Sequence, residues 1–168
     1  TKSPVWSSVD LRDGNQALPN PLNPEEKLKY FNLLCETGFK EIEVSFPSAS
    51  QDDYDFTRAL IEADRIPDDV DIMVLTQCRP ELIRRTFESI RGLKRGIFHA
   101  YCAASDLHMD QVFGLSREET KAMVKAAILQ IKAEAAALPG CDLRLEFSPE
   151  EFTDTELDYA LDLCEMVF

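Results

Sequence analysis

Residues 8–18 read SVDLRDGNQAL, a short apolar strand followed at once by a cation, a carboxylate and a turn glycine. Charged groups at the end of a strand lie at the carboxyl edge of a sheet, where α/β proteins build their sites. The stretch therefore predicts a functional site. From these residues alone, an Arg12–Asp13 ion pair beside a turn at Gly14 is the structural alternative.

The side chains of this stretch suit a metal and an oxyanion. Asp13 is a hard oxygen ligand for a divalent cation, and Arg12 can hold a carboxylate or enolate oxygen through its two-pronged guanidinium. Gly14 lets the backbone turn away, which leaves Asn15 and Gln16 to orient a ligand or a water molecule. We therefore expect metal binding at Asp13 and substrate binding at Arg12 and Gln16.

Outward from this stretch, apolar strand patterns alternate with amphipathic helix patterns along the chain. Strands are predicted at 5–10, 41–46, 70–75, 96–101 and 143–147, and helices at 24–37, 50–64, 80–90, 116–138 and from 153 to the chain end. Capping boxes are predicted at Ser116–Glu119 and Thr153–Glu156. Five consecutive βα units predict a parallel sheet with right-handed crossovers.

A doubly wound sheet and a (β/α)8 TIM barrel both fit this α/β alternation. The first turn lacks the glycine pattern of nucleotide-binding sheets, and polar residues instead follow every predicted strand. They are Arg12 and Asp13, residues 47–50, Thr76 and Gln77, His99 and Tyr101, and Ser148 and Glu150. Sites built from successive strand ends are typical of barrels, so we expect the chain to supply about the first five units of eight.

Composition excludes several functional classes. A chain of 168 residues with 45% hydrophobic residues can bury one sizeable core, and its net charge of -13 argues against nucleic-acid binding. The five cysteines are dispersed without CxxC spacing, so they predict neither a disulfide framework nor a zinc cage but a reducing, cytoplasmic setting. No apolar run is long enough for a membrane span, so we expect no membrane partner.

Several stretches, in order along the chain, together resemble one known family. They are Pro4-Val5-Trp6, 8–18, 38–44 (GFKEIEV), 46–51 (FPSASQ), 74–79 (VLTQCR), 83–88 (IRRTFE) and 147–150 (FSPE). The sequence resembles the catalytic barrel of the long-form 2-isopropylmalate synthases, among the metal-dependent condensing enzymes and lyases with an Asp-Arg-Glu signature. The resemblance implies that 1–168 is the amino-terminal portion of a single barrel domain, without the rest of the barrel and the regulatory domain.

The resemblance implies an acyltransferase that performs a Claisen condensation of acetyl-CoA with 2-oxoisovalerate, the first committed step of leucine biosynthesis. Asp13 is then the ligand of a divalent cation, Mg²⁺ or Mn²⁺ with Zn²⁺ as the alternative, and Arg12 stabilises the enolate and ketone oxygens. His99, Ser148 and Glu150 line the 2-oxo acid pocket, and Glu150 is expected to be the signature glutamate and to orient water or move protons.

Each of these residues also has a structural reading. His99 can be a satisfied core histidine, and Ser148 and Glu150 can belong to an ordinary strand-to-helix turn. Glu43 alternates with apolar neighbours, so we consider it a weaker candidate, an ion-pair partner pointing into the barrel.

The chain also departs from the family. Residues 102–110 (CAASDLHMD) lack the polar and cationic residues usual there, and the family's later His-x-His metal ligands are not in the sequence. These departures leave two alternatives open: a related synthase that uses another 2-oxo acid, of homocitrate or citramalate type, or a non-catalytic partial barrel. We expect the fragment alone to be inactive and the full-length protein to be a homodimer.

Overall fold

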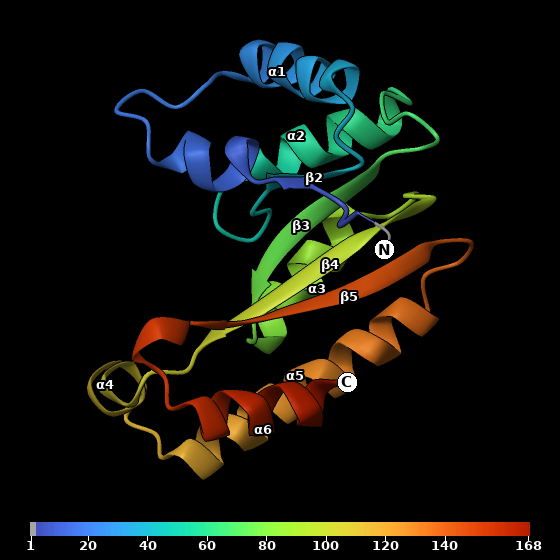
Figure 1. The fold of residues 1–168 in the computed structure, drawn as a ribbon. Coiled ribbons are helices and arrows are strands. Elements are labelled where there is room, and N and C mark those ends of the chain that lie inside the picture. Colours follow the sequence, from blue (N-terminus) through green and yellow to red (C-terminus); the bar gives the residue numbers. More distant parts are fainter. Residues whose placement is uncertain (1–2) are drawn as a thin grey trace.

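The computed structural model describes residues 3–168 and contains one parallel sheet of five strands. Along the sheet the strands follow the order of the chain, and the sheet is curved (Figure 1). The strands are β1 (Ser7–Ser8), β2 (Glu41–Ser45), β3 (Asp71–Gln77), β4 (Arg95–Ala103) and β5 (Asp142–Glu150). A doubly wound sheet would reverse its order beside the first strand, so the predicted sector of a barrel is confirmed.

A helix follows each strand, and these helices cover one face of the sheet. They are α1 (Pro24–Thr37), α2 (Gln51–Glu62), α3 (Pro80–Ser89), α5 (Arg117–Ala136) and α6 (Leu157–Val167), with short turns η1 (Asp10–Gly14), α4 (Asp106–His108), η2 (Met109–Phe113) and η3 (Phe152–Asp154). The capping box predicted at Ser116–Glu119 is confirmed, and Asn23 forms another at the start of α1. Within residues 3–168, no helix is both long and apolar enough to cross a bilayer.

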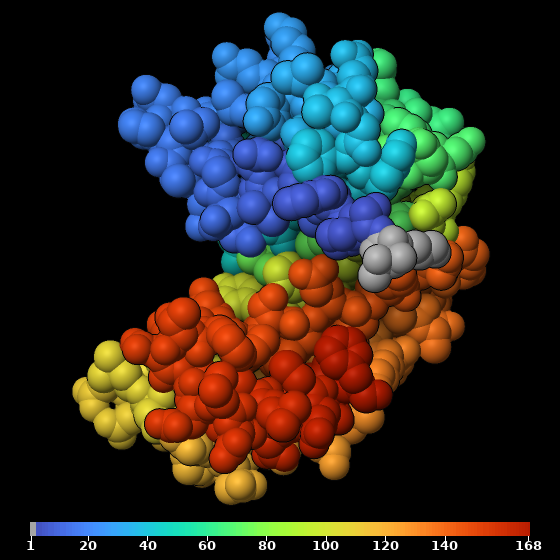
Figure 2. Space-filling view, viewed as in Figure 1, coloured from blue at the N-terminus to red at the C-terminus, as the bar shows by residue number. Residues whose placement is uncertain are grey.

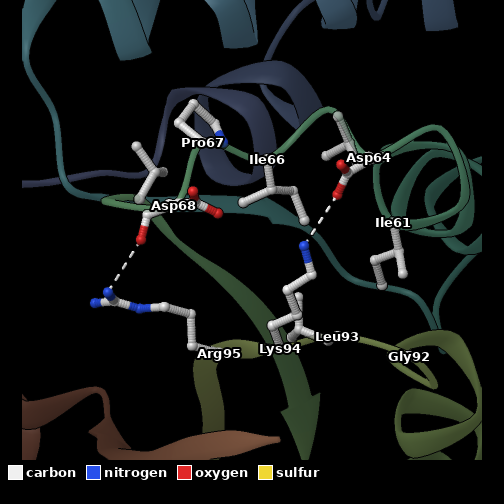
Figure 3. Close-up of a pocket in the computed structure, with 11 residues that line it drawn as sticks. Ile61, Asp64, Ile66, Pro67, Asp68, Gly92, Leu93, Lys94 and Arg95 are labelled. Atoms are coloured by element: carbon white, nitrogen blue, oxygen red, sulfur yellow. Dashed lines mark hydrogen bonds and ion pairs between the residues drawn. The ribbon is translucent and has the colours of Figure 1, made fainter.

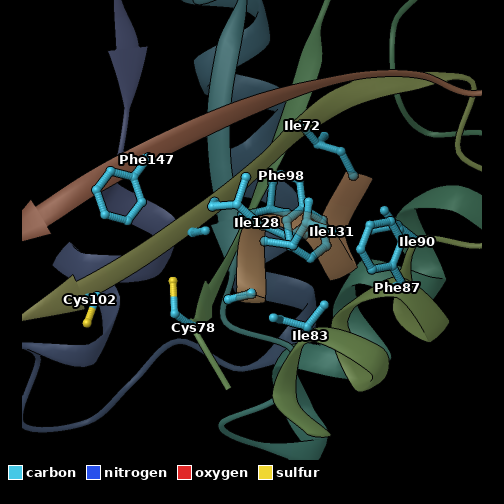
Figure 4. Close-up of a cluster of buried hydrophobic side chains, with 14 of the residues drawn as sticks. Ile72, Cys78, Ile83, Phe87, Ile90, Phe98, Cys102, Ile128, Ile131 and Phe147 are labelled. Carbon is cyan, nitrogen blue, oxygen red and sulfur yellow. The ribbon is translucent and has the colours of Figure 1, made fainter. Parts of the chain in front are cut away.

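The hydrophobic core lies between the convex face of the sheet and these helices (Figure 4). Phe98 of β4 stacks on Phe87 of α3 with ring centroids 4.3 Å apart, and Ile83 and Ile128 are buried in the same cluster. Because neighbouring residues of a strand point to opposite faces, the residues that alternate with this core lie on the concave face.

The amino-terminal end of the concave face is held by arginine–carboxylate pairs. Asp71 of β3 accepts hydrogen bonds from Arg95 of β4 and from Arg144 of β5, the latter at 2.7 Å. Arg144 also donates to Glu41 of β2 at 2.8 Å, and Glu41 accepts from Ser7 of β1 at 2.6 Å. This basal network therefore links all five strands.

The first strand is shorter than the predicted span of 5–10, because the backbone coils immediately after it. The amides of Arg12, Asp13 and Gly14 all donate to the carbonyl of Val9, at 3.2, 2.9 and 3.2 Å. These bonds form the π-helical turn η1, so Arg12 and Asp13 stand on a helical turn above the sheet and not at the last residues of a strand.

Two predictions near the chain end are corrected. Strand β5 continues to Glu150 in register with β4, so Ser148 and Glu150 lie on a strand and not in a turn. The capping box predicted at Thr153–Glu156 does not form: Thr153 lies in η3, and Glu156 caps α6 without a side-chain hydrogen bond. The left-handed backbone of Glu151 (φ 61°) starts η3 and so displaces the start of the helix.

Candidate active site

The carboxyl end of the concave face holds a cavity of about 260 Å³. Figure 2 shows the molecule hollowed between its amino-terminal residues, in blue, and the orange and red residues near its carboxyl end. All six site residues predicted from the sequence line the cavity. The lining residues are Arg12, Asp13, Gln16, Phe46, Leu75, His99, Tyr101, Ser148 and Glu150.

Arg12 is anchored at the mouth of the cavity by two carboxylates. Its Nε donates to Oε2 of Glu43 at 2.5 Å, and its Nη1 donates to Oδ1 of Asp13 at 2.9 Å. Glu43 is fully buried, whereas 61% of the Asp13 side chain is exposed. The guanidinium is therefore held by a buried anchor and faces a cavity in which Asp13 stays accessible.

His99 is hydrogen-bonded through both ring nitrogens. Its Nδ1 lies 2.6 Å from Oε1 of Glu43, and its Nε2 lies 2.7 Å from the Ser148 hydroxyl. The expectation that His99 and Ser148 share one pocket therefore holds in the geometry. His99 is 8% exposed and both of its ring nitrogens are hydrogen-bonded, as in a core histidine. Its ring nevertheless lines the cavity.

Glu43 is the residue that sequence reasoning undervalued. It contacts both Arg12 and His99, whereas Glu150 is exposed at the rim and makes no side-chain hydrogen bond to Arg12 among the described residues. The carboxylate of an Asp-Arg-Glu cluster in this structure is thus Glu43, which corrects the assignment of that place to Glu150. The signal was present in the alternation Ile42-Glu43-Val44, which turns the glutamate away from the core.

Asn15 has a structural role in place of the expected ligand contact. Its side-chain oxygen accepts a hydrogen bond from the backbone N–H of Leu22 at 2.7 Å, which ties η1 to the segment before α1. Gln16 is exposed and lines the cavity, as expected.

An apolar wall faces these polar groups. Phe46 and Tyr101 contact edge to face with centroids 6.0 Å apart, and Leu75 is buried beside them in the lining. Burial raises the pKa of the Tyr101 hydroxyl, and the nearby negative charge of Glu150 also raises it. A hydrogen bond with Gln77 lowers the pKa, but the net shift is upward. Tyr101 is therefore a neutral phenol at neutral pH, suited to contact the aliphatic part of a ligand.

The residues that the structure describes do not by themselves fit a divalent cation site. Across residues 3–168, no group of three His, Cys, Asp or Glu side chains is gathered closely enough to hold a metal ion. Asp13 supplies one oxygen, whereas such sites use several protein ligands. The second histidine, His108, lies elsewhere, with its Nδ1 3.1 Å from Glu151 and its ring against Phe113.

The unusual segment 102–110 packs beside the cavity. Cys102, Ala103, Ala104 and Ser105 are each less than 5% exposed, and Ser105 caps α4 and donates to Glu151. Burial raises the pKa of the Cys102 thiol to about 12, so it is not a thiolate nucleophile at neutral pH. None of these four residues lines the active-site cavity.

A small cavity of about 90 Å³ lies at the opposite end of the strands (Figure 3). Its walls are mainly aliphatic, including Ile61, Ile66 and Leu93, and Lys94 pairs with Asp64 at 3.3 Å across it. The amino-terminal end of a barrel is associated with stability and not with catalysis, so the candidate site is the cavity at the carboxyl end.

Comparison with known proteins identifies relatives of this chain. The chain is 53% identical to the 2-isopropylmalate synthase of Bifidobacterium longum over 99% of its own length and 26% of the relative. It is 54% identical to that of Streptosporangium roseum over 98% of its length and 29% of the relative. The chain thus spans less than a third of the length of these relatives.

Solved structures share the fold. An HMG-CoA lyase of Bacillus subtilis superposes with a TM-score of 0.68 at 21% identity, over 96% of this chain and 53% of that one. An HMG-CoA lyase of Acinetobacter baumannii, solved with coenzyme A and 3-methylmalate, superposes with a TM-score of 0.65 at 16% identity. The model of the HMGL-like family matches residues 3–168, and the chain therefore belongs to the HMGL-like family of enzymes.

Proposed function

We propose that this chain is part of an acyltransferase that condenses acetyl-CoA with 2-oxoisovalerate to give 2-isopropylmalate, the step that commits carbon to leucine. The observation that carries the proposal is the pairing of Arg12 with Asp13 at the mouth of a cavity that also holds His99 and Ser148. Identity of 53–54% to synthases of that name over nearly the whole chain supports it.

In this reaction the methyl group of acetyl-CoA loses a proton, and the resulting enolate carbon forms a bond to the ketone carbon of the 2-oxo acid. Negative charge then develops on the ketone oxygen, and hydrolysis of the thioester releases CoA. Arg12 suits the stabilisation of this charge, because Glu43 holds its guanidinium in place before the reaction begins. A preorganised donor needs no costly reorientation as the charge forms.

The remaining residues have complementary roles in the proposal. Gln16 offers hydrogen bonds to the polar end of the 2-oxo acid, and Leu75, Phe46 and Tyr101 contact its branched aliphatic end. Glu150, exposed at the rim, is placed to orient the water that attacks the thioester. Asp13 is the residue that would ligate Mg²⁺ or Mn²⁺.

A related synthase that condenses a different 2-oxo acid is the second candidate. The observation in its favour is segment 102–110, whose buried small residues directly follow Tyr101 of the apolar wall. A change there alters the space behind the wall and with it the size of the acyl acceptor. We also propose that the longer protein is a cytoplasmic homodimer, as the resemblance implies.

A thiol-release assay of the longer protein tests the proposal. Acetyl-CoA and Mg²⁺ or Mn²⁺ are supplied with a panel of 2-oxo acids: 2-oxoisovalerate, pyruvate and 2-oxoglutarate. We expect 2-oxoisovalerate to give the highest kcat/KM. A clear preference for pyruvate or 2-oxoglutarate would establish the second candidate, and no turnover with any acceptor would refute both.

The chain 1–168 by itself provides a separate test. We expect no condensation, because one carboxylate does not make a cation site and strands β1 and β5 leave open sheet edges. Thiol release and light scattering on the purified chain measure activity and association together. Robust turnover by a monodisperse monomer would contradict the expectation.

A further inference from the structure

A continuous set of hydrogen bonds connects Arg12 to Ser148 through two buried side chains. Arg12 Nε lies 2.5 Å from Glu43 Oε2, Glu43 Oε1 lies 2.6 Å from His99 Nδ1, and His99 Nε2 lies 2.7 Å from the Ser148 hydroxyl. The members come from η1, β2, β4 and β5, so the set crosses most of the sheet. Its buried centre is Glu43, which contacts a different partner with each oxygen.

The donors and acceptors in this set determine where its protons lie. Arg12 can only donate, so Oε2 of Glu43 accepts, and beside this cation Glu43 is an acceptor-only carboxylate. His99 must then donate from Nδ1 to Oε1. In a neutral imidazole this leaves Nε2 as an acceptor, and the hydrogen bond from Ser148 is the one that fills it.

We propose that Glu43 is a positioning residue that holds His99 in its Nδ1–H tautomer. The Ser148 hydroxyl then donates to His99 and acts only as a hydrogen-bond acceptor toward the cavity. With its proton committed to Nε2, Ser148 presents oxygen lone pairs to the cavity. The ligand group that meets Ser148 is therefore a hydrogen-bond donor such as a hydroxyl, while ligand carboxylate and ketone oxygens turn to Arg12 and Gln16. Only the identity of that ligand rests on the proposed function.

No other carboxylate among the described residues competes with Glu43 for this role. Glu146 is the second acid facing the ring, but its Oε1 lies 3.8 Å from Nε2, too far for a hydrogen bond, and its side chain is 44% exposed. His108 has a similar Nδ1–carboxylate pair with Glu151 at 3.1 Å, on a 27% exposed side chain. The chain thus holds a buried pair and a more exposed one for comparison.

The test is ¹⁵N NMR of the chain labelled only at histidine and made without a histidine tag. Because the sequence has two histidines, the imidazole spectrum contains two spin systems. Magic-angle-spinning spectra make the reading independent of any association. At a pH where the ring is neutral, we expect His99 to show a protonated Nδ1 and an unprotonated Nε2. A protonated Nε2 in the unmodified chain at neutral pH, in either a neutral or a charged ring, would overturn the proposal without any variant.

Variants then identify the cause. Glu43→Gln has one oxygen for two donors, so we expect His99 to shift toward the Nε2–H tautomer. Ser148→Ala should leave Nδ1–H in place, and Glu151→Gln should change only the His108 signals. Two outcomes would show that Glu43 does not set the tautomer of His99. One is loss of the Nδ1–H tautomer in the Ser148→Ala variant, and the other is its full retention in a folded Glu43→Gln variant.

The polarity at Ser148 is tested by ligand binding to the longer protein. Ser148→Ala should weaken a 2-hydroxy acid roughly 2- to 10-fold, the effect of one hydrogen bond, and weaken the matching 2-oxo acid less. Equal weakening of both ligands would reject the polarity assignment. If neither ligand binds the unmodified protein, the proposed function fails, while the NMR result still decides the role of Glu43.

Discussion

The two ends of the concave face both carry charged networks, but the networks differ in composition. At the amino-terminal end, Asp71 joins Arg95 and Arg144, which keep one charge state at any physiological pH. At the carboxyl end, Glu43 is hydrogen-bonded to Arg12 and to His99, and His99 is hydrogen-bonded to Ser148. His99 and Ser148 can exchange protons, and both line a cavity of about 260 Å³.

This difference shows how one curved sheet separates stability from chemistry. In the basal network a buried carboxylate is saturated by two guanidinium groups, so it joins strands without offering a reactive group. At the other end a buried carboxylate is divided between a cation and an imidazole, and an imidazole can accept or donate a proton. Substitutions at the two ends should therefore have different consequences, in rate at one end and in stability at the other.

The largest expected effect is on rate at the carboxyl end. In the longer protein, Arg12→Lys should lower kcat about 10²- to 10³-fold, because lysine cannot reproduce the anchored fork that faces the developing charge. Steady-state thiol release measures the effect, with Arg144→Lys of the basal network as the matched control, expected to keep the normal kcat. Near-normal turnover of Arg12→Lys would remove the role assigned to Arg12.

A second effect should appear in stability at the basal end. Asp71→Asn should lower the free energy of unfolding by roughly 1–3 kcal/mol, because a buried acceptor of charged hydrogen bonds is lost while both arginines can still reach water. Urea unfolding measures the change, and Asp69→Asn, at an exposed pair with Lys40, is the smaller control. An equal loss in the two variants would mean that burial of Asp71 does not matter.

The same carboxylate should make stability depend on acid pH. Burial alone would raise the pKa of Asp71, but hydrogen bonds and charge from Arg95 and Arg144 outweigh it and lower the pKa below its usual value. Its contribution is therefore complete above the unfolded value of about 3.9 and is lost as the pH falls through the lower folded value. Urea midpoints from pH 6 to 2.5 should show the gap between the unmodified chain and Asp71→Asn closing in acid.

The smallest expected effect is on stability at the carboxyl end. Ser148→Ala should change the free energy of unfolding by about 1 kcal/mol or less, because it removes one half-buried hydroxyl and leaves the Arg12–Glu43 contact in place. Urea unfolding beside Asp71→Asn makes the comparison direct. A loss as large as that of Asp71→Asn would show that both ends serve stability alike.

Much of the fold could be predicted because its signals are local. The alternation of strand and helix patterns, the Asn23 and Ser116 caps and the order of the strands follow from periodicity and turn chemistry over a few residues. Where local signals misled, a longer-range contact decided the outcome. Thr153 has the spacing of a capping box, but the left-handed turn at Glu151, which Ser105 and His108 contact from another segment, starts the η3 turn there.

The candidate site shows the same limit. The sequence by itself determined which side chains follow the strands, and hence that Arg12, His99 and Ser148 meet at one edge. Only the tertiary structure decided that Glu43 lies between Arg12 and His99, 31 and 56 residues away along the chain. Alternation within a strand sets the face on which a residue lies, whereas the curvature of the sheet and the register of its neighbours set what that residue touches.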